Sequence, residues 1–272
     1  MTNIAMFMSQ NRLDQEHGML NRLAIGLINE GEQVTRVIPP FQNNDPPEYE
    51  KVVSIIPRLL SPTHIPLLQR KEKHAALFDA LKKAKTTSIV SFGNSSFSLS
   101  CSMATQLEIP IFQEIYSIQQ VKRVKRRSIV KRWLAATPSI ERAITEKVGQ
   151  GRCSLVPLGI TPALNQEQTF DSQTQCIIVL NASDDAKETR SVLGILKTIP
   201  NTHVFLECKG RKDHKVWASI NDLNMHGQAT CLRDVASLRK LIPQADLLVL
   251  PFSRMEVSSV LLEAMESGVP VI

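Results

Sequence analysis

Residues 245–272 read ADLLVLPFSRMEVSSVLLEAMESGVPVI, and they guide the interpretation of the whole chain. The apolar run 247–250 predicts a buried strand, which ends at a proline. Apolar residues recur at helical spacing after Ser258, and Gly268 predicts the end of that helix. A buried strand, a polar loop and a helix in succession form the repeating unit of parallel α/β proteins. This stretch therefore predicts an α/β fold.

The same alternation runs along the rest of the chain. We expect strands at 3–8, 33–38, 52–56, 88–92, 133–136, 153–156, 176–180, 204–207, 229–232 and 246–250, with helices between several of them. Residues 161–175 are polar and rich in turn residues, which predicts a linker. We therefore expect two Rossmann-like domains with parallel sheets, at 1–160 and 176–272.

The composition excludes several classes of protein. Hydrophobic residues make up 43% of the 272 residues and charged residues 21%, which is an ordinary globular mixture. No apolar stretch approaches the roughly 18 residues of a membrane span, and the first ten residues lack the features of a signal peptide. The five cysteines form no CxxC pair, so we expect no metal site, and a cytoplasmic location. GxSxG, GxGxxG and P-loop motifs are absent, which argues against hydrolase triads, dinucleotide oxidoreductases and NTP hydrolysis.

Positive charge is concentrated in the first part of the chain. With histidine neutral, residues 1–160 carry a net +8 and residues 161–272 a net −2. No acidic residue lies between Glu114 and Glu141, whereas basic residues lie at Lys122, Arg123, Lys125, Arg126, Arg127, Lys131 and Arg132. We interpret residues 122–132 as a peripheral contact with an anionic membrane at its inner face, with a solvated helix face as the alternative. Few aromatic residues accompany this segment, so nucleic acid is not an expected partner.

The helix that begins near Val257 or Ser258 carries residues suited to binding phosphate and sugar. Free backbone N–H groups at a helix start bind phosphate, and small side chains at Ser258 and Ser259 would allow close approach. Glu263 lies four residues beyond Ser259, on the same face and one turn deeper. A carboxylate there can accept hydrogen bonds from sugar hydroxyl groups. The alternative is an exposed glutamate without a role in binding.

Several segments together resemble the family-4 retaining glycosyltransferases, which have the GT-B fold. PFS at 251–253, SSVLLEAM at 258–265 and SGVPVI at 267–272 are similar to that family's donor-site signature. His17-Gly18 and the segment around it resemble its acceptor-side opening, and VPLGI at 156–160 resembles the end of its first domain. The resemblance implies sugar transfer, with retention, from a nucleotide diphosphate sugar to a hydroxyl group of a glycan or lipid-linked acceptor. The nucleotide sugar would be a co-substrate, and neither a cofactor nor a metal is implied.

By position, the resemblance assigns the donor site to the second domain. Glu263 would hold the donor ribose, and the backbone amides around Val257, Ser258 and Ser259 would hold the diphosphate. Lys187 stands where the family has a phosphate-binding lysine, which would also stabilise the leaving group.

The catalytic and acceptor-side residues follow in the same way. His17 and Gly18 would lie in a loop ahead of the first helix, facing the acceptor. Glu256 is the acidic residue nearest to the position of the family's sugar-contacting glutamate. His17, Lys187 and Glu256 are therefore the expected catalytic residues.

Four positions depart from the family's pattern. Met255 stands in place of the sugar-contacting glutamate, Ala182 in place of a basic residue, and Asn181 in place of a glycine. Gln113-Glu114 stand where a histidine is usual. These departures favour a second interpretation, a non-catalytic binding or partner protein with the same fold. A nucleotide-sugar epimerase on a similar two-domain fold is a third.

The last residues, VPVI at 269–272, predict the first part of a buried strand. From the resemblance we expect about 100 further residues and hence an incomplete second domain. We also expect that the 272-residue chain alone is poorly soluble or inactive.

Overall fold

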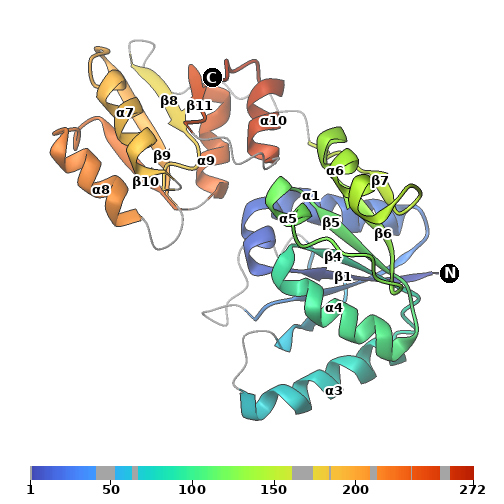
Figure 1. Cartoon of the computed structure of the whole chain (residues 1–272). Coiled ribbons are helices and arrows are strands. Elements are labelled where there is room, and N and C mark those ends of the chain that lie inside the picture. Colours follow the sequence, from blue (N-terminus) through green and yellow to red (C-terminus); the bar gives the residue numbers. More distant parts are fainter. Residues whose placement is uncertain are drawn as a thin grey trace. The chain divides into compact units, whose positions relative to one another are not determined.

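The computed structural model describes residues 2–40, 53–62, 67–160, 174–183, 185–208, 213–233, 235–251 and 258–272 (Figure 1). These residues form two compact units. Unit 1 comprises those through Leu158, and unit 2 comprises those from Gly159 onward. Each unit contains one parallel β-sheet, which confirms the predicted α/β class with two parallel sheets. The predicted linker at 161–175 lies almost entirely outside the described residues.

The sheet of unit 1 has seven strands in the order β3-β2-β1-β4-β5-β6-β7. The strands are β1 (Asn3–Met8), β2 (Gln33–Ile38), β3 (Arg58–Leu60), β4 (Ser88–Phe92), β5 (Ile111–Ile115), β6 (Val130–Ala135) and β7 (Cys153–Leu155). The helices are α1 (Gln10–Asn29), α3 (Leu67–Lys83), α4 (Asn94–Leu107), α5 (Ile118–Val121) and α6 (Pro138–Val148).

Alternating side chains of the strands form a core on each face of this sheet. In β1, Ala5 and Phe7 belong to a cluster that includes residues of α3, α4 and α6. Met6 and Met8 belong to a second cluster, with Leu13 and other residues of α1. The sheet is therefore covered on both faces, as its continuously apolar strands predict.

Local sequence signals set the start of several helices. Ser9 caps α1 and accepts a hydrogen bond from the Arg12 N–H, and Thr137 caps α6 with Pro138 in the first turn, as predicted. Gly93 precedes α4 with φ of 84°, and a Cβ atom there would lie 2.0 Å from the Ser9 Oγ atom. Only glycine fits this junction, where the ends of β1 and β4 approach closely.

The sheet of unit 2 has four strands in the order β10-β9-β8-β11. The strands are β8 (Gln175–Val179), β9 (Thr202–Glu207), β10 (Ala229–Leu232) and β11 (Leu247–Val249). The helices are α7 (Ala186–Leu196), α8 (Asp213–Asp222), α9 (Val235–Leu241), the 3₁₀ turn η3 (Ile242–Gln244) and α10 (Ser259–Glu266). Val271 forms a parallel bridge with Leu248, which agrees with the strand predicted for the last residues.

The helices of unit 2 cover both faces of its sheet. Ile177 and Val179 of β8 pack in one cluster, which includes residues of α7 and α8. Ile178 and Leu180 pack in another, with residues of α9 and α10. Figure 1 shows α7 and α8 on one side of this sheet and α9 and α10 on the other. Consequently α7 and α10, which follow the neighbouring strands β8 and β11, lie on opposite faces.

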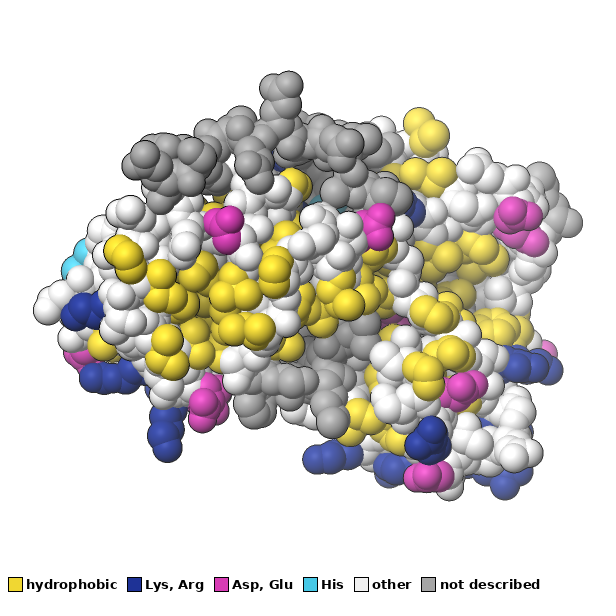
Figure 2. All heavy atoms as spheres, turned by 90° about the horizontal axis from the view of Figure 1, so that it is seen from above, with side chains coloured by type: hydrophobic (Ala, Val, Ile, Leu, Met, Phe, Trp, Pro, Cys, Tyr) yellow, Lys and Arg dark blue, Asp and Glu magenta, His cyan; other side chains and the backbone are white. Residues whose placement is uncertain are grey.

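Some large hydrophobic side chains of unit 2 remain at its surface. Ile195, Met265 and Ile272 are each more than 60% exposed. On the face in Figure 2, hydrophobic side chains gather in broad patches, whereas most charged side chains lie toward the outline. The two cores of unit 2 therefore do not enclose all of its apolar residues.

One predicted strand, at 52–56, is wrong. Residues 53–56 form a turn, and the strand of this region, β3, begins at Arg58. Val53 and Ile56 are nevertheless buried, packed in the cluster beside α1. A short apolar run indicates burial, but its length does not distinguish a strand from a buried turn. No helix among the described residues is long and apolar enough to cross a membrane.

Candidate functional site

The carboxyl ends of β8 and β11 form the switch point of the second sheet. From β8 the chain proceeds through β9 to β10 on one side, whereas β11 pairs with β8 on the other side. The helices that follow these two adjacent strands, α7 and α10, leave toward opposite faces of the sheet. In open α/β sheets, ligands bind at such a point. The starts of α7 and α10 are therefore placed where α/β proteins bind ligands.

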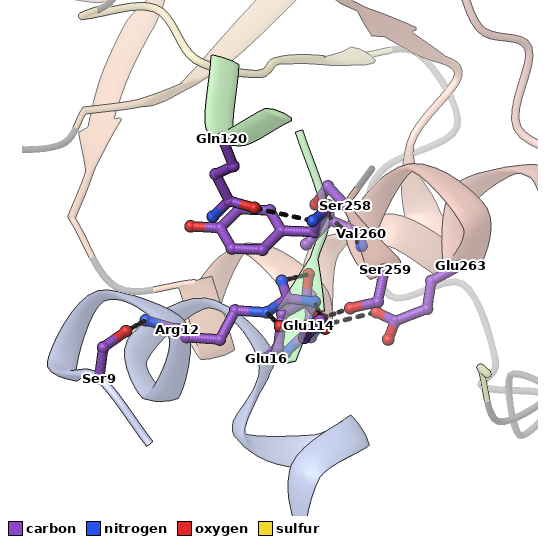
Figure 3. Close-up of polar contacts among 11 residues, drawn as sticks. Ser9, Arg12, Glu16, Glu114, Gln120, Ser258, Ser259, Val260 and Glu263 are labelled. Atoms are coloured by element: carbon purple, nitrogen blue, oxygen red, sulfur yellow. Dashed lines mark hydrogen bonds and ion pairs between the residues drawn. The ribbon is translucent and has the colours of Figure 1, made fainter. Parts of the chain in front are cut away.

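The start of α10 matches the prediction from the sequence. Ser258 is the N-cap residue, and its Oγ atom accepts a hydrogen bond from the Val260 N–H at 3.3 Å (Figure 3). Ser259 is fully buried as the first helical residue. The first N–H groups of a helix have no partner within the helix, and the helix dipole makes this end attractive to anions. Val257 and Glu256 lie outside the described residues.

Arg239 of α9 contacts two of the predicted binding residues. Its Nε atom donates to the Glu263 Oε2 atom at 2.8 Å, and its Nη2 atom donates to the Ser259 Oγ atom. Both charged side chains of this ion pair are less than one-fifth exposed. Arg239 therefore fixes the orientation of the Glu263 carboxylate and joins α10 to α9.

Arg239 is a candidate functional-site residue that the sequence alone does not reveal. A basic residue in the last turn of a helix is common, because it complements the negative end of the helix dipole. Its local pattern therefore carries no sign of a partner 24 residues away.

The loop after β8 is shaped by Glu207 at the end of β9. The Asn181 N–H donates to the Glu207 Oε2 atom at 2.8 Å, and the Ala182 N–H donates to the Glu207 carbonyl at 3.0 Å. Asn181 has φ of 53°, in the left-handed region where glycine is usual and asparagine is tolerated. This geometry explains how asparagine is accommodated at a backbone position that glycine usually occupies. Ala182 is fully buried and uncharged, so this position offers no cation to a ligand.

Lys187 lies in the first turn of α7, at the same edge of the sheet as the start of α10. Its side chain is exposed. The helix start beside it is already capped, because the Asp185 Oδ1 atom accepts hydrogen bonds from the Lys187 and Glu188 N–H groups at 3.0 and 3.2 Å. The ammonium group is thus the part of Lys187 that a ligand could use.

The expected position of His17 and Gly18 in a loop is wrong. Both lie inside α1, which begins at Gln10 and is kinked at Glu16, where φ is −131° and ψ is 26°. The polar residues before Leu20 obscured this helical start in the sequence. The kink immediately precedes His17, so the backbone at this point does leave regular helical geometry.

A buried charge cluster lies beside this kink in unit 1. Arg12 is 1% exposed, and its Nε and Nη2 atoms donate to the two carboxylate oxygens of Glu114 at 2.9 and 2.6 Å (Figure 3). Its Nη1 atom lies 3.4 Å from the Glu16 carboxylate, and its guanidinium lies over the Tyr116 ring. Burial alone would lower the pKa of Arg12, but Glu114, Glu16 and Tyr116 together outweigh this effect, and the pKa is raised.

This cluster gives a structural role to Glu114, where the resemblance seen in the sequence led us to expect a histidine. Its carboxylate is held by Arg12 in a bidentate pair, which is the strongest geometry for such an interaction. Gln113 is also buried and donates to the Glu114 carbonyl at 2.8 Å. Neither side chain therefore reproduces an exposed histidine, and both stabilise the end of β5.

Several solved structures have a fold similar to that of this chain over nearly its whole length. HepE from Anabaena, in complex with UDP and glucose, is 11% identical, with a TM-score of 0.73 over 100% of this chain and 80% of that one. Sucrose-phosphate synthase from Thermosynechococcus elongatus is 16% identical, with a TM-score of 0.67 over 100% and 80%. UDP-GlcNAc 2-epimerase from Methanocaldococcus jannaschii is 13% identical, with a TM-score of 0.66 over 99% and 83%.

These similarities define the fold of the chain. No family model and no curated protein sequence matches it. The chain has the GT-B fold, with two parallel α/β units. At such low sequence identity, structural similarity does not extend to a particular activity.

Proposed function

We propose that this protein uses a nucleotide diphosphate sugar and transfers its sugar, with retention, to a hydroxyl group of a glycan or lipid-linked acceptor. The observation that carries the proposal is the start of α10. It combines a serine cap, a fully buried serine and an oriented carboxylate at the switch point of a parallel sheet. The fold shared with HepE and sucrose-phosphate synthase supports it.

In this proposal the residues of unit 2 bind the donor. The first N–H groups of α10 hold the diphosphate, and Glu263 accepts hydrogen bonds from the ribose hydroxyls. The bond between the sugar C1 atom and the diphosphate oxygen breaks, and a bond to the acceptor oxygen forms on the same face of the sugar. The acceptor proton passes to the departing diphosphate, whose charge the Lys187 ammonium stabilises. Glu256 contacts the donor sugar, and His17 and Gly18 serve the acceptor side.

Two other candidate functions have specific support. An epimerase is supported by the shared fold of UDP-GlcNAc 2-epimerase. Incubation of the protein with a nucleotide sugar and no acceptor would reveal an epimerised sugar nucleotide as product. A non-catalytic binding protein is supported by Ala182, whose methyl side chain provides no cation at the proposed donor site.

Calorimetry with UDP, GDP and their sugars tests the donor site. We expect one nucleotide to bind the wild-type chain and Glu263→Gln to weaken binding about tenfold or more, because a hydrogen bond to a charged group is lost. Glu266→Gln is the matched control, since Glu266 lies on the same helix and is exposed. If the folded wild-type protein binds no nucleotide, the enzyme proposal is refuted.

We further propose that residues 122–132 contact an anionic membrane surface. Each basic residue near such a surface contributes about 1 kcal/mol at low ionic strength. Sedimentation with phosphatidylglycerol vesicles should show binding that weakens as salt is added. Absence of binding even at low salt would contradict this contact.

A further inference from the structure

A cavity lies in unit 1, at the amino-terminal edge of its sheet. Its volume is about 710 Å³, within the range of small-molecule sites. Its wall includes Ile109 and Pro110 just before β5, Ile129 just before β6 and Arg152 just before β7. Because all strands are parallel, these amino ends share one edge of the sheet. The cavity is therefore separate from the carboxyl edge, where Arg12 and Glu114 lie.

Basic side chains predominate among the charged residues of this cavity. Lys131, Arg132 and Arg152 line it, and Glu108 is the acidic residue among those that line it. Ser128 and Thr105 add hydroxyl groups. Lys131 and Arg132 belong to a segment without acidic residues, so the positive charge there is not balanced by neighbours along the chain.

Hydrogen bonds within the protein hold the two arginines in place. The Arg132 Nη1 atom donates to the Ser154 Oγ atom at 2.9 Å, and the Arg152 Nη1 atom donates to the Val130 carbonyl at 3.3 Å. A guanidinium carries five N–H donors, so each arginine retains others beyond this bond. Two positioned guanidinium groups and an ammonium group suit the oxygens of a phosphate.

We propose that this cavity is a binding site for a phosphate group, independent of the proposed donor site. The phosphate belongs to a membrane lipid headgroup or to a small soluble phosphate compound, which present the same chemistry to Lys131, Arg132 and Arg152. The apolar side chains Ile109 and Ile129 lie beside the cations and provide a surface for the uncharged part of such a ligand.

Inorganic pyrophosphate is the probe for the first experiment, with the complete chain. Hydrogen exchange of the wild-type protein, measured by mass spectrometry, should show protection at residues 105–111, 128–132 and 150–153 when pyrophosphate is added. This measurement shows which segments a ligand protects. Pyrophosphate bound at the start of α10 would protect that helix and would therefore be distinguished from pyrophosphate in the cavity. Protection confined to other segments, or none, would overturn the proposal whether or not the donor site exists.

Two charge-matched triple variants then test the side chains. Replacement of Lys131, Arg132 and Arg152 by glutamine should weaken pyrophosphate binding at the cavity at least about tenfold, since charge-assisted hydrogen bonds are lost. Replacement of Lys71, Lys73 and Lys83 by glutamine removes the same charge from exposed positions on α3, outside both the cavity and residues 122–132, and should change the affinity less than about threefold. Equal losses in the two variants would mean diffuse attraction and would refute a defined site.

Phosphatidylglycerol vesicles distinguish the two sources of phosphate. If the ligand is a lipid headgroup, the cavity variant loses more vesicle binding than the control variant does. If pyrophosphate binds at the cavity but both variants bind vesicles equally, the ligand is a soluble phosphate compound. Circular dichroism shows whether each variant is folded. If a variant does not fold, the hydrogen-exchange experiment on the wild-type protein still tests the proposal.

Discussion

Arg12 and Arg239 each hold two polar groups, and each joins two elements that are separate in the sequence. Arg12 binds Glu16 and Glu114, and Arg239 binds Ser259 and Glu263. A buried or half-buried charge is tolerated only when it is paired, and breaking such a pair leaves an uncompensated charge. At the scale of single residues, these arginines therefore position the candidate acceptor-side helix and the candidate donor helix.

The substitution Glu114→Gln tests the pair in unit 1. We expect the free energy of unfolding to fall by about 3 kcal/mol, because Arg12 stays charged and buried while it loses its bidentate partner. Urea denaturation followed by circular dichroism measures the change. Glu146→Gln on the exposed face of α6 is the control and should change stability by less than about 0.5 kcal/mol. A similar, small effect in both variants would contradict this role of Arg12.

The cysteines should differ in their reactivity with iodoacetamide. The Cys208 thiol donates a hydrogen bond that lowers the pKa of Cys231. Burial raises the pKa of Cys153 and of Cys176 to about 11. Because its pKa is lower, Cys231 holds a larger thiolate fraction at pH 8. The thiolate is the nucleophile, so Cys231 should be alkylated first. Peptide mass spectrometry gives the order in which the cysteines are alkylated. Faster labelling of Cys153 or Cys176 than of Cys231 would contradict the prediction.

At the scale of elements, the starts of helices depend on short signals that the sequence displays. Thr137 and Pro138 predict the start of α6, and Ser258 predicts the start of α10 to within one residue. The start of α1 was missed, because its cap at Ser9 precedes a polar stretch with few apolar residues. The strand predicted at 52–56 failed for the opposite reason, since its apolar residues are buried in a turn.

The junction between β4 and α4 should tolerate no side chain. Gly93 and Gly149 have nearly the same backbone conformation, with φ of 84° and 90° and ψ of 164° in both. A Cβ atom would clash with Ser9 at Gly93, whereas it would meet no atom within 4 Å at Gly149. Both alanine variants bear backbone strain, but Gly93→Ala should lose about 2 kcal/mol more stability. Thermal denaturation of the two variants compares them, and equal melting temperatures would disprove the close contact.

At the scale of the whole molecule, the two units have separate cores and different charge. Both hydrophobic clusters of unit 1 consist of residues up to Leu158, and those of unit 2 begin at Cys176 or later in the chain. The excess of basic residues lies in residues 1–160. The candidate donor residues and the phosphate cavity therefore belong to different units, and each can be tested without the other.

A fragment of residues 1–158 should fold alone. Its sheet and both clusters are built from its own residues, and its size is that of an ordinary domain. We expect a cooperative thermal transition and a circular dichroism spectrum of a mixed α/β protein. A fragment that melts without cooperativity would show that unit 1 needs residues from the rest of the chain.

The sequence by itself determined the α/β class, most of the strands, and the candidate helix with Ser258, Ser259 and Glu263. These features follow from hydrophobic periodicity and helix caps, which act over a few neighbouring residues. Only the tertiary structure decided the strand order and the partners of the charged side chains. Arg12 meets Glu114 from 102 positions away, and Arg239 meets Glu263 from 24. Such pairs form because the sheet brings distant segments together at one edge or on one face, and no local pattern records which segments become neighbours.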